Sequence, residues 1–235
     1  MTHSETMAPP GVNKEAILAF KQISNEERLI ADTLNGFNKF TFDPIIDVGS
    51  GTGLIAALAW PSRNVLLVDM EEYPAPTDQM HTRVRANFFH EDWSEGRSAG
   101  TLVFSHSLQY LDENMPLLNR RIAELAPRTV LSVTDVREGF YGELVAWAEC
   151  TLPNINPEHA HYTFAGYEVV ETVRFHSTIA AHDMMTLAQL MVGALLDHIV
   201  APNEMETCVD FFQTHLKGPD VRLAQIAQVH RCAEL

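Results

Sequence analysis

The sequence of 235 residues predicts an α/β fold, and three observations support that prediction. Short apolar runs rich in β-branched residues alternate with stretches of helical periodicity. The first run, 45–48, leads through a glycine-rich turn into a helix at 54–60, as a buried parallel strand would. The chain then ends with a late strand at 167–179, a helical pair within 183–216 and a closing strand at 221–231.

Two helices are expected before the first strand, within residues 14–36. Ala16, Ile17, Phe20 and Ile23 recur at the spacing of one helix face. Because these helices precede the sheet, we expect them to pack on it or to cover a site at its edge.

Further strands and helices alternate after the first unit. Strands are expected at 64–70, 86–93, 101–104 and 128–135, with helices at 116–126 and 142–150. The proline-containing stretch 71–86 predicts a loop with at most a short helix. Roughly 40 residues separate the last two strands, which is long for a hairpin loop. We therefore interpret 183–216 as a small helical cap.

The glycine-rich turn has the sequence Asp-Val-Gly-Ser-Gly-Thr-Gly over residues 47–53. Glycine permits a left-handed backbone and a close ligand approach, and the helix behind it offers unpaired N–H groups. The spacing differs from the G-x-G-x-x-G of dinucleotide sites, and no P-loop lysine follows. The pattern resembles motif I of the class I S-adenosylmethionine-dependent methyltransferases.

The resemblance implies a doubly wound, mostly parallel seven-stranded sheet with an antiparallel last strand. It also implies S-adenosyl-L-methionine as cofactor and methyl donor. On this reading residues 1–235 form a single domain, with N-terminal helices at 14–36 and the cap at 183–216. The cap is a departure from the family, which commonly joins its final two strands by a short hairpin.

The cofactor residues follow from the strand ends. Asp69 ends the second strand, where an acid can accept hydrogen bonds from both ribose hydroxyls, and the resemblance assigns it this role. The resemblance also implies that Asp92 accepts from the adenine amino group beside the Trp93 ring, and that Asp47 faces the ammonium of the methionine part. The full set expected at the cofactor is Asp47, Gly49, Ser50, Gly51, Gly53, Asp69, Met70, Asp92, Trp93 and Ser105.

Methyl transfer from a sulfonium is an in-line displacement that needs donor and nucleophile roughly 3–3.5 Å apart. A base is needed only if the acceptor arrives protonated. His106, in a run that resembles motif IV of small-molecule methyltransferases, is the candidate base. Tyr141 is a second candidate catalytic residue, and Asp135 lies at the same sheet edge.

Composition limits the partners. The formal net charge is −15, which disfavours a nucleic-acid substrate and suits a small molecule. The three cysteines are widely spaced, so neither a disulfide framework nor a zinc site is expected, and no other metal site is predicted. The N-terminus lacks a signal peptide and no membrane span is expected, so we expect a cytoplasmic protein. A homodimer is left open.

Three functions fit these residues. The first is a methyltransferase acting on an O, N or C nucleophile of a small metabolite. The second keeps the cofactor but changes the reaction, so that S-adenosylmethionine cyclises to azetidine-2-carboxylate and methylthioadenosine. The third is a non-catalytic protein that binds S-adenosylmethionine, because a fold alone never determines function.

Overall fold

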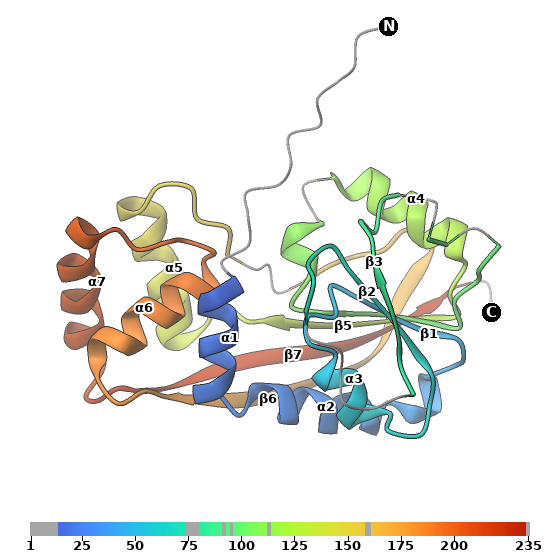
Figure 1. Cartoon of the computed structure of the whole chain (residues 1–235), viewed down its shortest axis with the longest axis horizontal. Coiled ribbons are helices and arrows are strands. Elements are labelled where there is room, and N and C mark those ends of the chain that lie inside the picture. Colours follow the sequence, from blue (N-terminus) through green and yellow to red (C-terminus); the bar gives the residue numbers. More distant parts are fainter. Residues whose placement is uncertain are drawn as a thin grey trace, which may run out of the picture.

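The structure is a computed structural model that describes residues 14–73, 80–90, 93–94, 96–111, 114–157 and 161–233. In this part of the chain, seven strands form one sheet in the order β3-β2-β1-β4-β5-β7-β6 (Figure 1). The strands are β1 Ile45–Val48, β2 Val65–Asp69, β3 Thr82–Arg85, β4 Thr101–Ser105, β5 Thr129–Asp135, β6 Tyr167–Ala180 and β7 Asp220–Cys232.

The pairing confirms the predicted topology. Strands β1 to β5 are mutually parallel, and β7 runs antiparallel to both of its neighbours, β5 and β6. From the neighbours β1 and β4 the chain proceeds outward in opposite directions along the sheet. The carboxyl ends of β1 and β4 therefore mark the topological switch point, beside which sheets of this kind bind their ligands.

The third strand lies earlier in the chain than the predicted range 86–93, so that prediction is wrong. β3 lies at Thr82–Arg85, and its side chains are exposed or half-buried. An edge strand of this kind needs no apolar run, so the sequence pattern is weak. Phe88 instead lies after the strand and packs edge-on against Phe104 of β4, with ring centroids 5.7 Å apart.

Helices cover both faces of the sheet. α2 Glu26–Gly36 and α3 Leu54–Ala59 lie on one face and α4 Met115–Leu125 on the other, with short 3-10 turns at Asn38–Phe40 and Leu108–Tyr110 (Figure 1). Successive residues of β1 serve opposite faces, since Ile45 packs with the α2 core and Ile46 with the α4 core. Burying one such side chain contributes about 1.5–3 kcal/mol.

A second helical group lies beyond the end of β5 (Figure 1). It contains α1 Lys14–Ile23, α5 Gly139–Thr151, α6 Met184–Leu195 and α7 Pro202–His215. Its core includes Phe20, Met191 and Phe212, together with Ile179 and Leu223 from the extended ends of β6 and β7. The long β6–β7 hairpin thus carries the helical pair expected between the last two strands. Within the described residues, no helix has the length and apolar character needed to traverse a bilayer.

The link between α1 and α2 is fixed to β6. The N–H of Asn25 donates to the carbonyl of Thr178 at 3.2 Å, and its side-chain oxygen accepts from the N–H of Thr178 at 2.8 Å. Both N-terminal helices are therefore held against the sheet and the cap rather than projecting from them.

Candidate functional site

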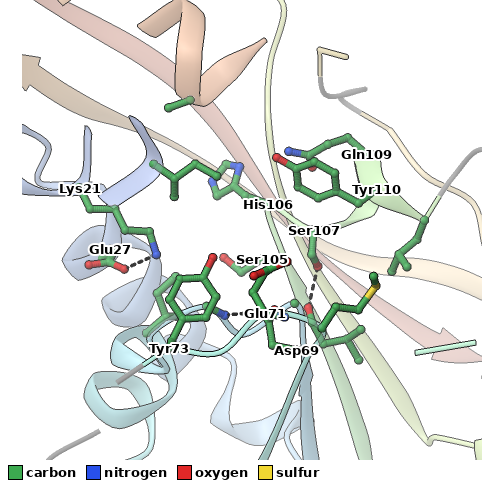
Figure 2. Close-up of a pocket in the computed structure, with 18 of the residues that line it drawn as sticks. Lys21, Glu27, Asp69, Glu71, Tyr73, Ser105, His106, Ser107, Gln109 and Tyr110 are labelled. Atoms are coloured by element: carbon green, nitrogen blue, oxygen red, sulfur yellow. Dashed lines mark hydrogen bonds and ion pairs between the residues drawn. The ribbon is translucent and has the colours of Figure 1, made fainter. Parts of the chain in front are cut away.

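A cavity of about 430 Å³ lies at the carboxyl edge of the sheet. The last residues of four parallel strands line it, namely Val48 of β1, Asp69 of β2, Ser105 of β4 and Asp135 of β5. Figure 2 shows its polar side chains, with His106 and Tyr110 on the β4 side. Both the position, next to the switch point, and the volume are typical of a small-ligand site.

The glycine-rich turn forms one wall. Gly49, Gly51 and Gly53 have φ angles of 69°, 53° and 79°, in the left-handed region. A Cβ on Gly49 would lie 2.4 Å from the Cβ of Ser107 in the turn after β4. Ser107 also donates to the carbonyl of Val48 at 2.7 Å, which ties the two turns together. Glycine at position 49 is therefore required both by the backbone angle and by the space.

Asp69 fixes the next turn and faces the cavity. Its Oδ2 accepts from the N–H of Gly51 at 2.8 Å, and its Oδ1 accepts from the N–H of Glu71 at 2.8 Å. Each carboxylate oxygen has a further lone pair, so the group can also accept from a ligand hydroxyl. Met70, Glu71 and Tyr73 line the cavity beside it.

α1 contributes Ile17, Phe20 and Lys21 to the cavity wall. Lys21 lies 2.7 Å from the Glu27 carboxylate, and its ammonium approaches Gly51 closely enough that a Cβ there would be 3.5 Å away. Further along α1, the Lys14 ammonium donates to the backbone carbonyl of Glu72. Among the described residues that line the cavity, Lys21 is the only lysine or arginine.

Asp47 lies buried behind the glycine turn and does not line the cavity. Burial raises the pKa of Asp47 to about 7, and the charge of Asp69 acts in the same direction. Lys21 and Arg83 oppose the rise, and Arg83 also donates to the carbonyl of Gly51 at 2.7 Å. The protonation of Asp47 is therefore sensitive, near neutral pH, to any cation that enters the cavity.

His106 has a left-handed backbone with φ of 51°, and its N–H donates to the carbonyl of Val133 at 3.0 Å. Such a conformation costs a non-glycine residue roughly 1–2 kcal/mol. Strained residues of this kind cluster at functional sites. The strain places the imidazole at the cavity wall.

Two buried carboxylates flank this imidazole. Nε2 of His106 is 3.8 Å from Oε1 of Glu26, and Nδ1 is 3.8 Å from Oδ2 of Asp135. Burial raises the pKa of Glu26 to about 7, against the opposing effect of His106 and with a contribution from Asp135. Gln225 of β7 donates from its side chain to Glu26.

The predicted site residues do not all meet in the cavity. Six line it: Gly49, Gly51, Asp69, Met70, Ser105 and His106. Ser50 and Gly53 complete the turn, and Asp47 lies behind it, without lining the cavity. Tyr141 is 1% exposed and packs in the core of the cap, so it has no access to a ligand there. Asp92 lies outside the described residues.

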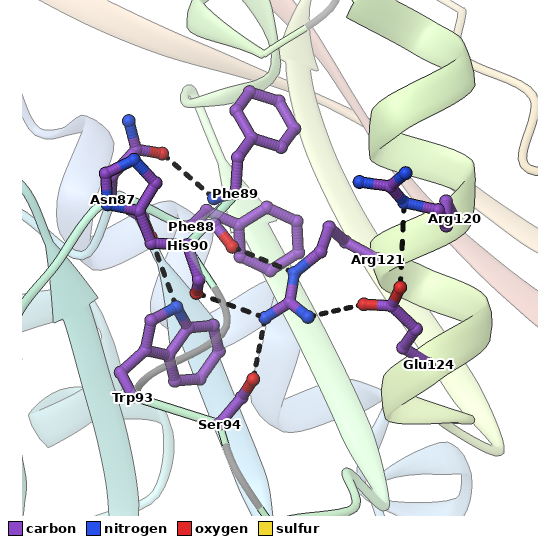
Figure 3. A network of polar contacts seen from close by, with 9 residues as sticks. All are labelled: Asn87, Phe88, Phe89, His90, Trp93, Ser94, Arg120, Arg121 and Glu124. Atoms are coloured by element: carbon purple, nitrogen blue, oxygen red, sulfur yellow. Dashed lines mark hydrogen bonds and ion pairs between the residues drawn. The ribbon is translucent and has the colours of Figure 1, made fainter. Parts of the chain in front are cut away.

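Trp93 belongs to a network that holds the segment after β3 (Figure 3). The Arg121 guanidinium, 5.8 Å from the Trp93 ring, donates to the carbonyl of Phe88 at 3.2 Å and to the hydroxyl of Ser94 at 2.6 Å. The indole itself donates to the carbonyl of Asn87 at 3.2 Å. Trp93 is buried and does not line the cavity, whereas Phe88 does. Arg121 thus positions a segment of the cavity wall from behind.

Sequence reasoning missed several cavity residues. They are Lys21, Glu26, Glu27, Glu71, Tyr73, Gln109 and Tyr110. The three on α1 and α2 precede the first strand, and no spacing relates them to the glycine turn. Glu71 and Tyr73 lie two and four residues after Asp69, so the position of the second strand end was the available signal.

Comparisons with known proteins find similarity at the level of structure. No protein-family model and no curated protein matches the chain. The chain is similar to a protein named as a type II methyltransferase from Anaeromyxobacter dehalogenans, with a TM-score of 0.54 and 13% identity over 86% of this chain and 94% of that one. It is also similar to a cyclopropane-fatty-acyl-phospholipid synthase-like protein from Lactobacillus casei, with a TM-score of 0.55 and 12% identity over 87% and 90%.

Identities this low show a common fold and do not transfer a substrate. The strand order, the antiparallel last strand and the glycine turn at the switch point agree with that similarity. The chain has the Rossmann-like fold of the class I S-adenosylmethionine-dependent methyltransferases.

Proposed function

We propose that the protein is an S-adenosylmethionine-dependent methyltransferase that acts on an O, N or C nucleophile of a small metabolite. The observation that carries the proposal is the glycine turn, which is hydrogen-bonded to Asp69 and lines with it a small-ligand cavity beside the switch point. The cavity residues fit the cofactor, because Gly49 and Gly51 present backbone without side chains to the cavity and Asp69 lines it beside them as an acceptor.

The cofactor would lie along the β1 and β2 ends. Asp69, with Glu71 beside it, would accept from the ribose hydroxyls. Lys21, near Gly51, would pair with the carboxylate of the methionine part, and Asp47 would balance its ammonium from behind the turn. We retain Asp92 as the proposed acceptor for the adenine amino group, with Phe88 in place of Trp93 as the wall.

The acceptor would bind on the β4 and β5 side, against His106, Gln109 and Tyr110. α1, together with Ala194 and Leu195 at the end of α6, covers the acceptor side of the cavity. A cavity covered in this way suits a small molecule and excludes water from the transfer. The protein's net charge of −15 supports an acceptor other than a nucleic acid.

Asp69→Ala is expected to weaken S-adenosylmethionine binding by roughly 10-fold to 150-fold. The reason is the loss of charge-assisted hydrogen bonds worth about 1.5–3 kcal/mol. Titration calorimetry measures the change, and Glu72→Ala is the matched control because Glu72 is a neighbouring acid that does not line the cavity. Unchanged affinity in Asp69→Ala would remove this residue from the site.

His106→Asn is expected to lower turnover by roughly a hundredfold while leaving cofactor affinity unchanged. Asparagine tolerates the left-handed backbone at this position, so the variant removes the imidazole without adding strain. Turnover is measured as S-adenosylhomocysteine formed with the acceptor, across pH 6 to 9. The exposed His182 on the cap gives the control variant His182→Asn. Equal rates in His106→Asn and the wild type at every pH would show that His106 does not act as a base in the transfer.

A further inference from the structure

Three side chains from separate elements converge on the β5 side of the cavity. Glu26 begins α2, His106 follows β4, and Asp135 ends β5. One donor atom from each lies within 4.8 Å of the other two. Glu26 is 7% exposed and Asp135 is 2% exposed, yet all three residues line the cavity. The donors therefore face a common space from within the protein.

The cluster is rich in negative charge. Two buried carboxylates this close together are costly unless a cation compensates them. The charges of His106 and Lys21 both act on Glu26, but the Lys21 ammonium pairs directly with another carboxylate, that of Glu27, at 2.7 Å. The hydrogen bond from Gln225 satisfies a lone pair of Glu26 but brings no charge.

Gln225 provides a second, independent observation. Its side chain is fully buried, and it lies opposite Asp135 in the β5–β7 pairing. Its amide nitrogen is 3.3 Å from Nε2 of His106, while its Oε1 accepts no hydrogen bond. A half-turn of the amide exchanges its oxygen and nitrogen. It would direct Oε1 toward Glu26 and His106, an arrangement that a cation between these groups stabilises.

We propose that Glu26, His106 and Asp135 form a divalent metal site, with Oε1 of Gln225 as a fourth ligand. Two carboxylates, an imidazole and an amide oxygen suit a first-row cation such as Mn²⁺ better than Mg²⁺. Metal–ligand bonds of about 2.1 Å place opposite ligands about 4.2 Å apart. Adjacent octahedral ligands would lie about 3 Å apart, so the three donor atoms, which now lie within 4.8 Å of one another, must draw closer when the ion binds.

The proposal differs from the sequence expectation of no metal, because the ligands are too far apart along the chain to form a spacing motif. The cation would face the acceptor side of the cavity and bind an oxygen of the acceptor. His106 would then act as a metal ligand rather than as a free base. This role, unlike the site itself, rests on the proposed function.

Binding of Mn²⁺ alone tests the site. The chelator-treated full chain is titrated with Mn²⁺ by calorimetry, without S-adenosylmethionine, and free Mn²⁺ is followed by electron paramagnetic resonance. We expect one ion per chain, bound more tightly than Mg²⁺. Glu26→Gln and Asp135→Asn should each weaken binding by roughly tenfold or more, because each removes one of the two ligand charges.

Two control variants separate this site from the acidic surface. Glu27→Gln removes the neighbouring acid in the same cavity, and Asp183→Asn removes a half-buried acid beside His182, at the start of the cap. Both should leave Mn²⁺ affinity unchanged. Circular dichroism checks that each variant folds, and if one ligand variant does not fold, the other decides the result.

Absence of stoichiometric Mn²⁺ binding would overturn the proposal. So would one-to-one binding that Glu26→Gln and Asp135→Asn leave intact. The proposed function is measured separately, by calorimetry with S-adenosylmethionine. A chain that binds Mn²⁺ but not S-adenosylmethionine contradicts the function and leaves the metal site standing, and the reverse result contradicts only the metal site.

Discussion

Gly49→Ala is expected to abolish S-adenosylmethionine binding and to lower the free energy of unfolding by roughly 2–5 kcal/mol. The alanine would adopt a left-handed backbone, at a cost of roughly 1–2 kcal/mol. Its Cβ would also lie 2.4 Å from the Cβ of Ser107, so one of the two turns must shift, at a cost of roughly 1–3 kcal/mol. Calorimetry measures the binding, and urea unfolding measures the stability.

Two further variants separate the effect of the left-handed backbone at position 49 from the effect of the close contact with Ser107. Gly166 has φ of 80° with no atom within 4 Å of an added Cβ, so Gly166→Ala should lose stability but keep cofactor affinity. Adding Ser107→Gly to Gly49→Ala removes the close contact and should recover part of the binding. Wild-type affinity in Gly49→Ala alone would mean that this turn does not hold the cofactor.

Asp47→Asn is expected to stabilise the free protein at pH 7.5 by up to about 4 kcal/mol. Burial, with the charge of Asp69, raises the pKa of Asp47 from 3.8 to about 7 in the folded state, which corresponds to about 4 kcal/mol between the two protonation states. Between these two pKa values, Asp47 holds a proton in the folded state that it has released in the unfolded state. The stability that Asp47 contributes is complete below pH 4 and is lost as the pH rises through 7. Urea unfolding of both proteins from pH 4.5 to 7.5 should therefore converge at the acid end.

Cofactor binding is expected to release a proton from Asp47. The ammonium of the cofactor would favour the carboxylate and lower its pKa. Calorimetry at pH 6.5 in two buffers of different ionisation enthalpy measures the protons released, and Asp47→Asn should release fewer. Identical proton release in both proteins would place the ammonium away from Asp47.

The sequence predicted those parts of the fold that strong local patterns encode. The run 45–48 and the glycines after it indicated a buried strand and a ligand turn, and Asp69 followed at a strand end. The period-two pattern of 221–231 indicated the closing strand, which runs antiparallel to its neighbours β5 and β6, as the resemblance implied. Each of these elements is recognised within a few residues of chain, so tertiary contacts were not needed.

Other features depend on tertiary contacts that no local pattern reports. β3 is an edge strand whose side chains are exposed or half-buried, so it lacks an apolar pattern. The aromatic residues that follow it, Phe88 among them, instead indicated a strand at 86–93. Tyr141 was placed at the sheet edge by its position after β5, but the cap covers it. Glu26 and Gln225 meet His106 only because α2 and β7 fold onto the same edge.

Mass spectrometry of the purified protein with S-adenosylmethionine, alone and with a metabolite extract, tests the proposed function most directly. The account predicts S-adenosylhomocysteine only when the extract is present, at a rate that Gly49→Ala abolishes and Gly166→Ala does not. Methylthioadenosine formed without the extract, faster than in a boiled control, would instead indicate chemistry on the cofactor itself. Neither product, together with no binding by calorimetry, would contradict the assignment of the glycine turn as a cofactor site.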